Sequence, residues 1–219
     1  MACDPFQMAL IHQAFRAQFD ALPELISAVA ANDTVRSKRV GAHLANMIDV
    51  LHHHHAAEDD VLWPRLLERA PLQEKDVRQA VNEHDGVSAT IDHVLSLRAP
   101  WAASADPVLT ERLAARVDDL AGELGDHLDN EEQTIVPLIE QWIAADEWQA
   151  FIDRGGAYVK PANLQFALAF AGFVLDESTP DEQERFIASV PFAPRLLLKG
   201  LGGRAVTSYR TKVYGGISR

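Results

Sequence analysis

The feature that most constrains the fold of this chain is an internal repeat with helical spacing. Residues 54–64 read HHAAEDDVLWP, and residues 127–137 read HLDNEEQTIVP. Each copy has a histidine, a glutamate four residues later, a second acidic residue directly after it, and a proline six residues after the glutamate. Residues four apart lie on the same face of an α-helix. Each copy therefore predicts a histidine and a carboxylate that point in one direction from a helix.

Apolar residues recur with the period of an α-helix through four long stretches. We predict helices over residues 5–31, 35–69, 72–98 and 107–147, with kinks or early ends at Pro23, Pro64 and Pro137. Ala99 and Pro100 are expected to end the third helix and residues 101–106 to form a loop. This region has no convincing strand pattern. The fold class that we predict is all-α, an up-down-up-down four-helix bundle with a C-terminal helical extension.

The chain changes character after residue 156. Residues 166–175 are small and apolar, Pro191 and Pro194 bracket an expected break, and the glycines at 200, 202 and 203 are expected to loosen the end. We predict two or three shorter helices there. The predicted domains are residues 1–147, the bundle with its metal site, and residues 148–219, an extension packed on the bundle.

Composition narrows the function classes. The single cysteine, Cys3, excludes a disulfide framework and a cysteine-ligated zinc or iron–sulfur site. A net charge of −12 argues against nucleic acid as a partner. We find no signal peptide and no apolar stretch long enough to cross a bilayer, and we expect a cytoplasmic protein. Residues 190–219 carry six Lys or Arg and no Asp or Glu. We interpret this basic tail as docking on the acidic body, with an anionic partner as the alternative.

The histidines that lie on apolar helix faces are the candidate metal ligands. The second and fourth helices of such a bundle are parallel, so the two repeat copies can face each other at the same height. The first and third helices each add one histidine on an apolar face, whereas His93 is expected to point outward. The predicted inward set is His12, His54, Glu58, His84, His127 and Glu131.

The run of four histidines at residues 52–55 leaves an ambiguity, because His55 and Asp59 are also four residues apart. The repeat favours His54 and Glu58, because Glu58 precedes a proline by six residues and Asp59 does not. His52, His53 and His55 are then expected to face neighbours or solvent, or to support the ligands. We expect His43 to be a hydrogen-bonded inner histidine rather than a ligand.

Burying two carboxylates without partners is costly, by roughly several kcal/mol each, and a bound metal pair removes that cost. Imidazole suits divalent transition metals such as iron, and carboxylates can bridge two ions. We therefore favour a metal site over a metal-free polar core.

Residues 1 to about 145 resemble the hemerythrin-like, or HHE cation-binding, proteins. The resemblance rests on His12 followed by Arg16, on residues 54–59, on Glu83 followed by His84, and on residues 127–132. It implies a non-haem centre of two Fe ions with an oxo or hydroxo bridge. In that centre, Glu58 and Glu131 would bridge the ions, and His12, His54, His84 and His127 would be terminal ligands.

The third helix departs from the pattern of the oxygen-carrying hemerythrins. They are similar but have a second histidine four residues after the first, where this chain has Ser88. The centre is expected to lack one nitrogen ligand, and water, hydroxide or another side chain would fill the gap. Tyr158, Tyr209 and Tyr214 are left open as candidates. This departure argues against reversible oxygen carriage and favours chemistry at the metal.

The function that we predict is reaction with oxygen species in oxidative or nitrosative stress. The reaction is either hydrogen peroxide decomposition, as a catalase-like dismutation, or O2 or NO binding. The alternative is a non-enzymatic iron, oxygen or redox sensor or carrier. A ferritin-like oxidase requires Glu-x-x-His on two helices, and a zinc protease requires His-Glu-x-x-His. Neither motif occurs in the sequence.

Overall fold

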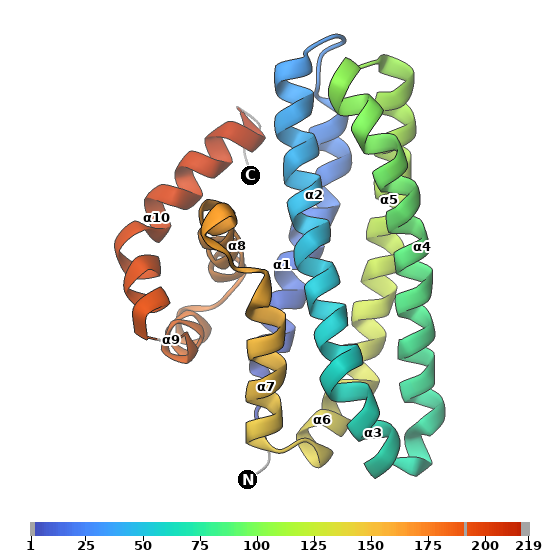
Figure 1. The fold of residues 1–219 in the computed structure, drawn as a ribbon, viewed down its shortest axis with the longest axis vertical. Helices are drawn as coiled ribbons and strands as arrows, with labels where there is room; N and C mark the ends of the chain where they lie inside the picture. Colours follow the sequence, from blue (N-terminus) through green and yellow to red (C-terminus); the bar gives the residue numbers. More distant parts are fainter. Residues whose placement is uncertain (1–2, 191, 216–219) are drawn as a thin grey trace.

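The computed structural model describes residues 3–190 and 192–215, and the described residues are helical, with no strand among them. Four long helices lie side by side along the long axis of the molecule (Figure 1): α1 (Phe6–Ser27), α2 (Thr34–Ala57), α4 (Glu74–Ser104) and α5 (Pro107–Asn130). The α1–α2 and α4–α5 connections lie at one end. The connection from α2 to α4 lies at the other end and includes α3 (Trp63–Arg69).

The connection between α4 and α5 is shorter than the sequence predicted. The prediction that Pro100 ends the third helix is wrong, because α4 continues to Ser104 and closes on Ala105, which has a left-handed backbone (φ 48°). Trp101 explains the extra turn. Its side chain is fully buried, and its indole N–H donates to Thr110 Oγ1 at 2.9 Å. Burial of this large ring offsets the cost of a proline inside the helix.

Each repeat copy contains one wide helical turn that begins at its glutamate. The π-helical segments are η1 (Glu58–Leu62), which leads into α3, and η3 (Glu131–Ile135), which leads into α6 (Val136–Trp142). The N–H of Trp63 donates to the carbonyl of Glu58, five residues back. In the same way, the N–H of Val136 donates to the carbonyl of Glu131. The next residue in each copy is the proline, which has no N–H and crowds the carbonyl four residues back. The wider turn accommodates the proline without ending the helix.

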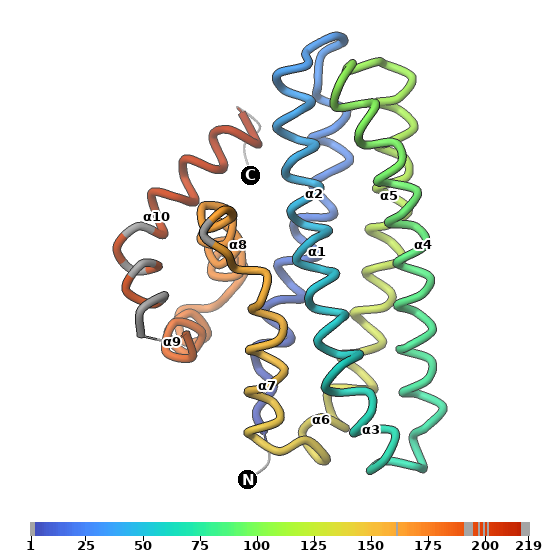
Figure 2. Tube along the Cα trace, in the orientation of Figure 1, coloured from blue at the N-terminus to red at the C-terminus, as the bar shows by residue number. Residues whose placement is uncertain are grey.

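Three further helices follow α7 (Ala145–Gly155), and together they lie beside α1 and α2 (Figures 1 and 2). They are α8 (Leu164–Asp176), α9 (Pro180–Ser189) and α10 (Phe192–Tyr214). α10 packs closely on α8 at Gly172, where an added Cβ would overlap Val206.

The end of the chain is more regular than the sequence predicted. α10 is one continuous helix that includes Pro194 and the glycines at 200, 202 and 203, and Pro191 lies outside the described residues. The basic segment makes contacts with the rest of the molecule. Arg210 pairs with Asp176 of α8, and Arg36 of α2 donates to the Lys212 carbonyl.

The predicted ligands separate the apolar core into two clusters. The larger cluster includes Phe15, Leu51 and Leu124, and the smaller one includes Leu62 and Ile139. His54 of the predicted set packs against Phe15 of the larger cluster and Phe151 of the smaller one, so the candidate site has apolar side chains of both clusters beside it. Within the described residues, no helix combines the length and the apolarity that a membrane crossing requires.

Candidate metal centre

The structure brings all six predicted residues together, and each is at least 95% buried. His12 comes from α1, His54 from α2, His84 from α4 and His127 from α5, while each glutamate is the first residue of a π-helical turn. A seventh residue, His55, joins them. The ligand-type atoms fall into two groups, each within 4.8 Å: His12, His54, Glu58 and Glu131 in one, and His55, His84 and His127 in the other.

The first group combines two histidines with two carboxylates. His12 Nε2 lies 3.2 Å from His54 Nε2 and 3.5 Å from Glu131 Oε2, and His54 Nε2 lies 3.1 Å from Glu58 Oε1. The Phe15 ring packs against His54, with 5.4 Å between ring centroids. These nitrogen and oxygen atoms therefore share one small, apolar-walled space.

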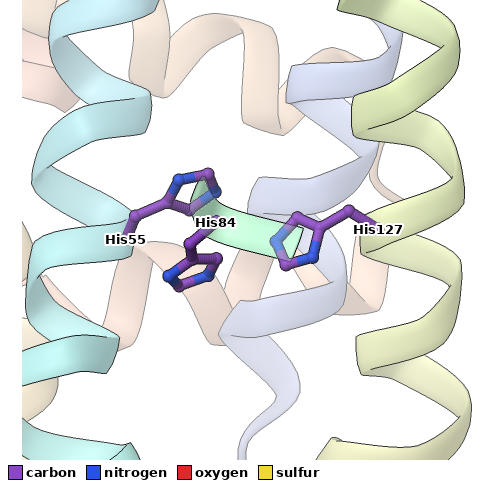
Figure 3. Close-up of side chains that lie close together, drawn as sticks. All are labelled: His55, His84 and His127. Atoms are coloured by element: carbon purple, nitrogen blue, oxygen red, sulfur yellow. The ribbon is translucent and has the colours of Figure 1, made fainter. Parts of the chain in front are cut away.

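The second group consists of three imidazoles (Figure 3). The His55 and His84 rings are stacked, with centroids 4.1 Å apart, and the His127 ring stands nearly perpendicular to both. The glutamates connect this group to the first. The second carboxylate oxygen of Glu58 lies 3.3 Å from His84 Nε2, and Glu131 Oε2 lies 3.7 Å from His127 Nε2. Each glutamate thus faces histidines of both groups.

Three of the histidines are oriented by acceptors on the side away from the site. Glu132 Oε1 lies 3.0 Å from His12 Nδ1, Asp59 Oδ1 lies 3.1 Å from His84 Nδ1, and Glu83 Oε2 lies 3.2 Å from His127 Nδ1. An ionised carboxylate can only accept, so each Nδ1 carries a proton, and each Nε2 is turned toward the glutamates in the interior. A histidine held this way is typical of metal sites.

Two of the three orienting carboxylates are themselves held in place. Arg16 donates to Glu132 at 2.8 Å, and Asn130 donates to Glu83 at 3.0 Å. The acidic residue that follows the glutamate in each repeat copy therefore has a role: Asp59 and Glu132 each orient a histidine on a neighbouring helix. Burial would raise the pKa of Glu132, but its hydrogen bonds to His12 and Arg16 lower it.

The electrostatics of the site are unbalanced in the protein alone. Both oxygens of Glu58 and of Glu131 are buried without a hydrogen-bond partner among the described residues, and so are the inward nitrogens of His84 and His127. Burial raises the pKa of Glu131 well above 4.5, and the nearby Glu58 carboxylate raises it further. Burial would also raise the pKa of Glu58, but His54 and His84 lower it to about 2. Metal cations placed between the two groups would bind these unpaired oxygen and nitrogen atoms. The side chains at this site therefore fit a pair of metal ions.

His55 is the inward residue that the sequence analysis missed. It was expected to face neighbours or solvent or to support the ligands, but it is 5% exposed and stacked on His84. Neighbouring residues on a helix point about 100° apart, and α2 packs against both α1 and α4. His54 faces His12 of α1, and His55 faces His84 of α4. The absence of a histidine four residues after His84, together with the His54–His55 pair, is the signal that could have found it.

The other histidines and tyrosines considered from the sequence lie elsewhere. His52 and His93 are exposed, and His43 is fully buried and hydrogen-bonded to the Tyr209 hydroxyl at 3.1 Å. Tyr214 donates to Gln18 at 2.5 Å. Tyr158 packs on Phe170. The sequence led us to expect one missing nitrogen ligand beside His84. The side chain next to His84 is His55, and none of the three tyrosines lies there.

Buried histidines and glutamates that converge between long helices form the kind of site that can hold metal ions. The family model for the hemerythrin HHE cation-binding domain matches residues 7–139, more than half of the chain, so the chain belongs to this family. The match ends within α6 and leaves α7 to α10 outside it. Among curated proteins and solved structures, none matches the chain significantly.

Proposed function

We propose that this protein is a non-haem di-iron protein that reacts with oxygen species, by decomposing hydrogen peroxide or by binding O2 or NO. The observation that carries the proposal is the pair of buried glutamates whose oxygens lack partners and face histidines on both sides. Membership of the hemerythrin family supports iron as the metal. In this proposal the four long helices form an up-down-up-down bundle, residues 1–147 make up the metal-binding domain, and residues 148–219 are its extension.

The proposed ligands are the six predicted residues together with His55. One ion would be held by His12 and His54, the other by His55, His84 and His127, with Glu58 and Glu131 shared between them. The His12 and His54 side would supply one nitrogen donor fewer than the side of His55, His84 and His127. A bound iron pair would supply the redox chemistry and the binding of small oxygen species. The chain contributes oriented imidazoles and an interior from which bulk water is excluded.

Metal content and optical spectrum, before and after peroxide addition, test the proposal directly. Two irons per chain with absorption from an oxo bridge, and gas evolution with peroxide, would support peroxide decomposition. Two irons with a spectral change under O2 or NO but no turnover would support the binding function. Absence of stoichiometric metal in protein produced with ample iron would contradict the proposal and leave these side chains as a polar network.

The seventh ligand has its own test. His55→Ala should lower bound iron from two ions toward one per chain, because it removes one of only three nitrogen donors to the second ion. His52→Ala is the matched control, since His52 lies in the same histidine run but is exposed. Iron analysis of both variants distinguishes the two cases. Equal iron content in His55→Ala and wild type would remove His55 from the ligand set.

A second candidate function is a non-enzymatic sensor or carrier. It is favoured by the contact between the extension and the site, because Phe151 of α7 packs edge-on against His54 with ring centroids 6.0 Å apart. Loading the site would then change the protease sensitivity of residues 148–219 while peroxide turnover stays negligible. Identical digestion of loaded and empty protein would argue against this function.

A further inference from the structure

A cavity lies between the long helices and the C-terminal extension, outside the two metal-ligand groups but next to one of them. Its volume is about 240 Å³, and it is lined by residues of α1, α2, α7, α8 and α9. One of its lining residues is the buried His54, which also belongs to the first metal-ligand group. Two others, Val159 and Ser189, are exposed. The cavity therefore borders both the protein surface and the side of the site that has fewer nitrogen donors.

The chemistry of the cavity wall differs from that of the rest of the protein. About a quarter of all residues are charged (24%), yet none of the described lining residues is Asp, Glu, Lys or Arg. Four aromatic side chains come from the extension and its connections: Phe151, Tyr158, Phe170 and Phe186. A charged ligand would be buried here without a counterion, at a cost of roughly several kcal/mol. Aromatic walls instead favour a flat, apolar ligand.

The cavity is larger than a small oxygen species requires. Dry cavities of about 150 Å³ lined by aliphatic and aromatic side chains bind one benzene molecule, and this cavity is larger, at about 240 Å³. We propose that the cavity is a binding site for an uncharged aromatic molecule of one or two rings, which lies beside His54. The elements that complete the cavity, α7 to α9, lie outside the residues that match the family model. The proposed site is thus a feature of the extension, and it does not depend on the metal.

The test is a fluorescence titration of the full chain with 1-naphthylamine, an aromatic probe of two rings that is uncharged at neutral pH. We expect saturable binding at one site per chain. The sulfonated counterpart, 5-amino-1-naphthalenesulfonate, should bind at least about tenfold more weakly, because none of the described lining residues is a charged residue that could pair with it. Equal affinity for the two probes, or no saturable binding of the neutral one, would overturn the proposal.

Variants of the lining residues test whether the probe binds in this cavity. Ala171→Phe on α8 fills the cavity and should weaken binding at least about tenfold, whereas Ala150→Phe on the exposed face of α7 should leave it unchanged. Ser189→Trp, at the exposed end of the cavity, serves the same purpose if Ala171→Phe does not fold. Unchanged binding in the folded cavity variants would place the probe elsewhere and refute the site. Titrating metal-free protein keeps this test separate from the proposed function, because a missing metal site would not remove the cavity.

Discussion

At the scale of single residues, the candidate site is built from side chains that each face two directions. Glu58 and Glu131 turn their oxygens to histidines of both groups, and three histidines hold a carboxylate on one ring nitrogen while the other points inward. Such residues stabilise a bound cation and destabilise the empty protein. Substitutions here should therefore have opposite effects on metal binding and on the stability of the metal-free fold.

Glu131→Gln separates these two effects. Without its carboxylate the site should lose most of its iron, while the metal-free protein should become more stable by about 1–3 kcal/mol at pH 7. The pKa of Glu131 is raised by burial, so the unfolded chain releases this proton more readily and metal-free wild type loses stability as the pH rises above 4.5. Glu131→Gln has no carboxyl group to titrate at this position, so it does not lose stability in this way. The difference in the free energy of unfolding between the variant and the wild type should therefore grow as the pH rises.

Iron analysis and urea unfolding of metal-free protein at several pH values measure both effects. Glu140→Gln is the control, because Glu140 follows in α6 and is exposed. It should change neither quantity. A Glu131→Gln variant that keeps its iron would show that this carboxylate is not a ligand.

The limits of sequence inference also appear at the residue scale. The repeat identified both glutamates and the faces of His54 and His127, because spacing along one helix determines which residues share a face. Spacing within one helix does not say which neighbours that helix has. His55 escaped prediction for this reason: its direction becomes informative only once α4 is known to lie beside α2.

At the scale of elements, the helices followed from apolar periodicity, and their ends depended on tertiary contacts. The sequence predicted four long helices and kinks or ends at Pro23, Pro64 and Pro137. It could not predict the extra turn of α4, which depends on the burial of Trp101, or the continuity of α10. Pro64 and Pro137 follow π-helical turns that begin at a candidate ligand, whereas Pro23 lies inside α1. π-helical turns are often associated with functional sites.

The double variant Pro64→Ala/Pro137→Ala tests this association. Alanine restores the missing N–H and relieves crowding of the carbonyl four residues back, so the wide turns can relax toward α-helix and displace Glu58 and Glu131. We expect iron affinity to fall about tenfold, similar to the loss of a supporting contact around a ligand.

Competition with a chelator measures the affinity, and circular dichroism checks that the helices remain. Pro23→Ala is the matched control, since Pro23 lies inside α1 in ordinary α-helix. Its iron affinity should equal that of wild type. Unchanged affinity in the double variant would mean that the glutamates are positioned without the wide turns.

At the scale of the whole molecule, the extension is joined to the long helices through a buried histidine distant from the candidate metal site. His43 of α2 is fully buried, and its ring packs against Phe173 of α8 and against Tyr209 and Tyr214 of α10. Its Nδ1 pairs with the Tyr209 hydroxyl, and its Nε2 has no partner among the described residues. Burial raises the pKa of Tyr209 to about 12, so this tyrosine carries no charge near neutral pH. A charged His43 therefore has no counterion in these contacts.

This arrangement predicts an acid-sensitive attachment of the extension. Burial lowers the pKa of His43 from 6.5 to about 3, so below pH 6.5 the unfolded chain binds a proton that the folded protein excludes. Its contribution to stability is complete above pH 6.5 and is lost as the pH falls toward 3, by about 2 kcal/mol at pH 5. His43→Leu should remove this part of the pH dependence of urea unfolding, whereas His93→Leu, at an exposed position, should keep it. If the two variants show the same slope between pH 5 and 6.5, protonation of His43 does not limit the stability of the assembled fold.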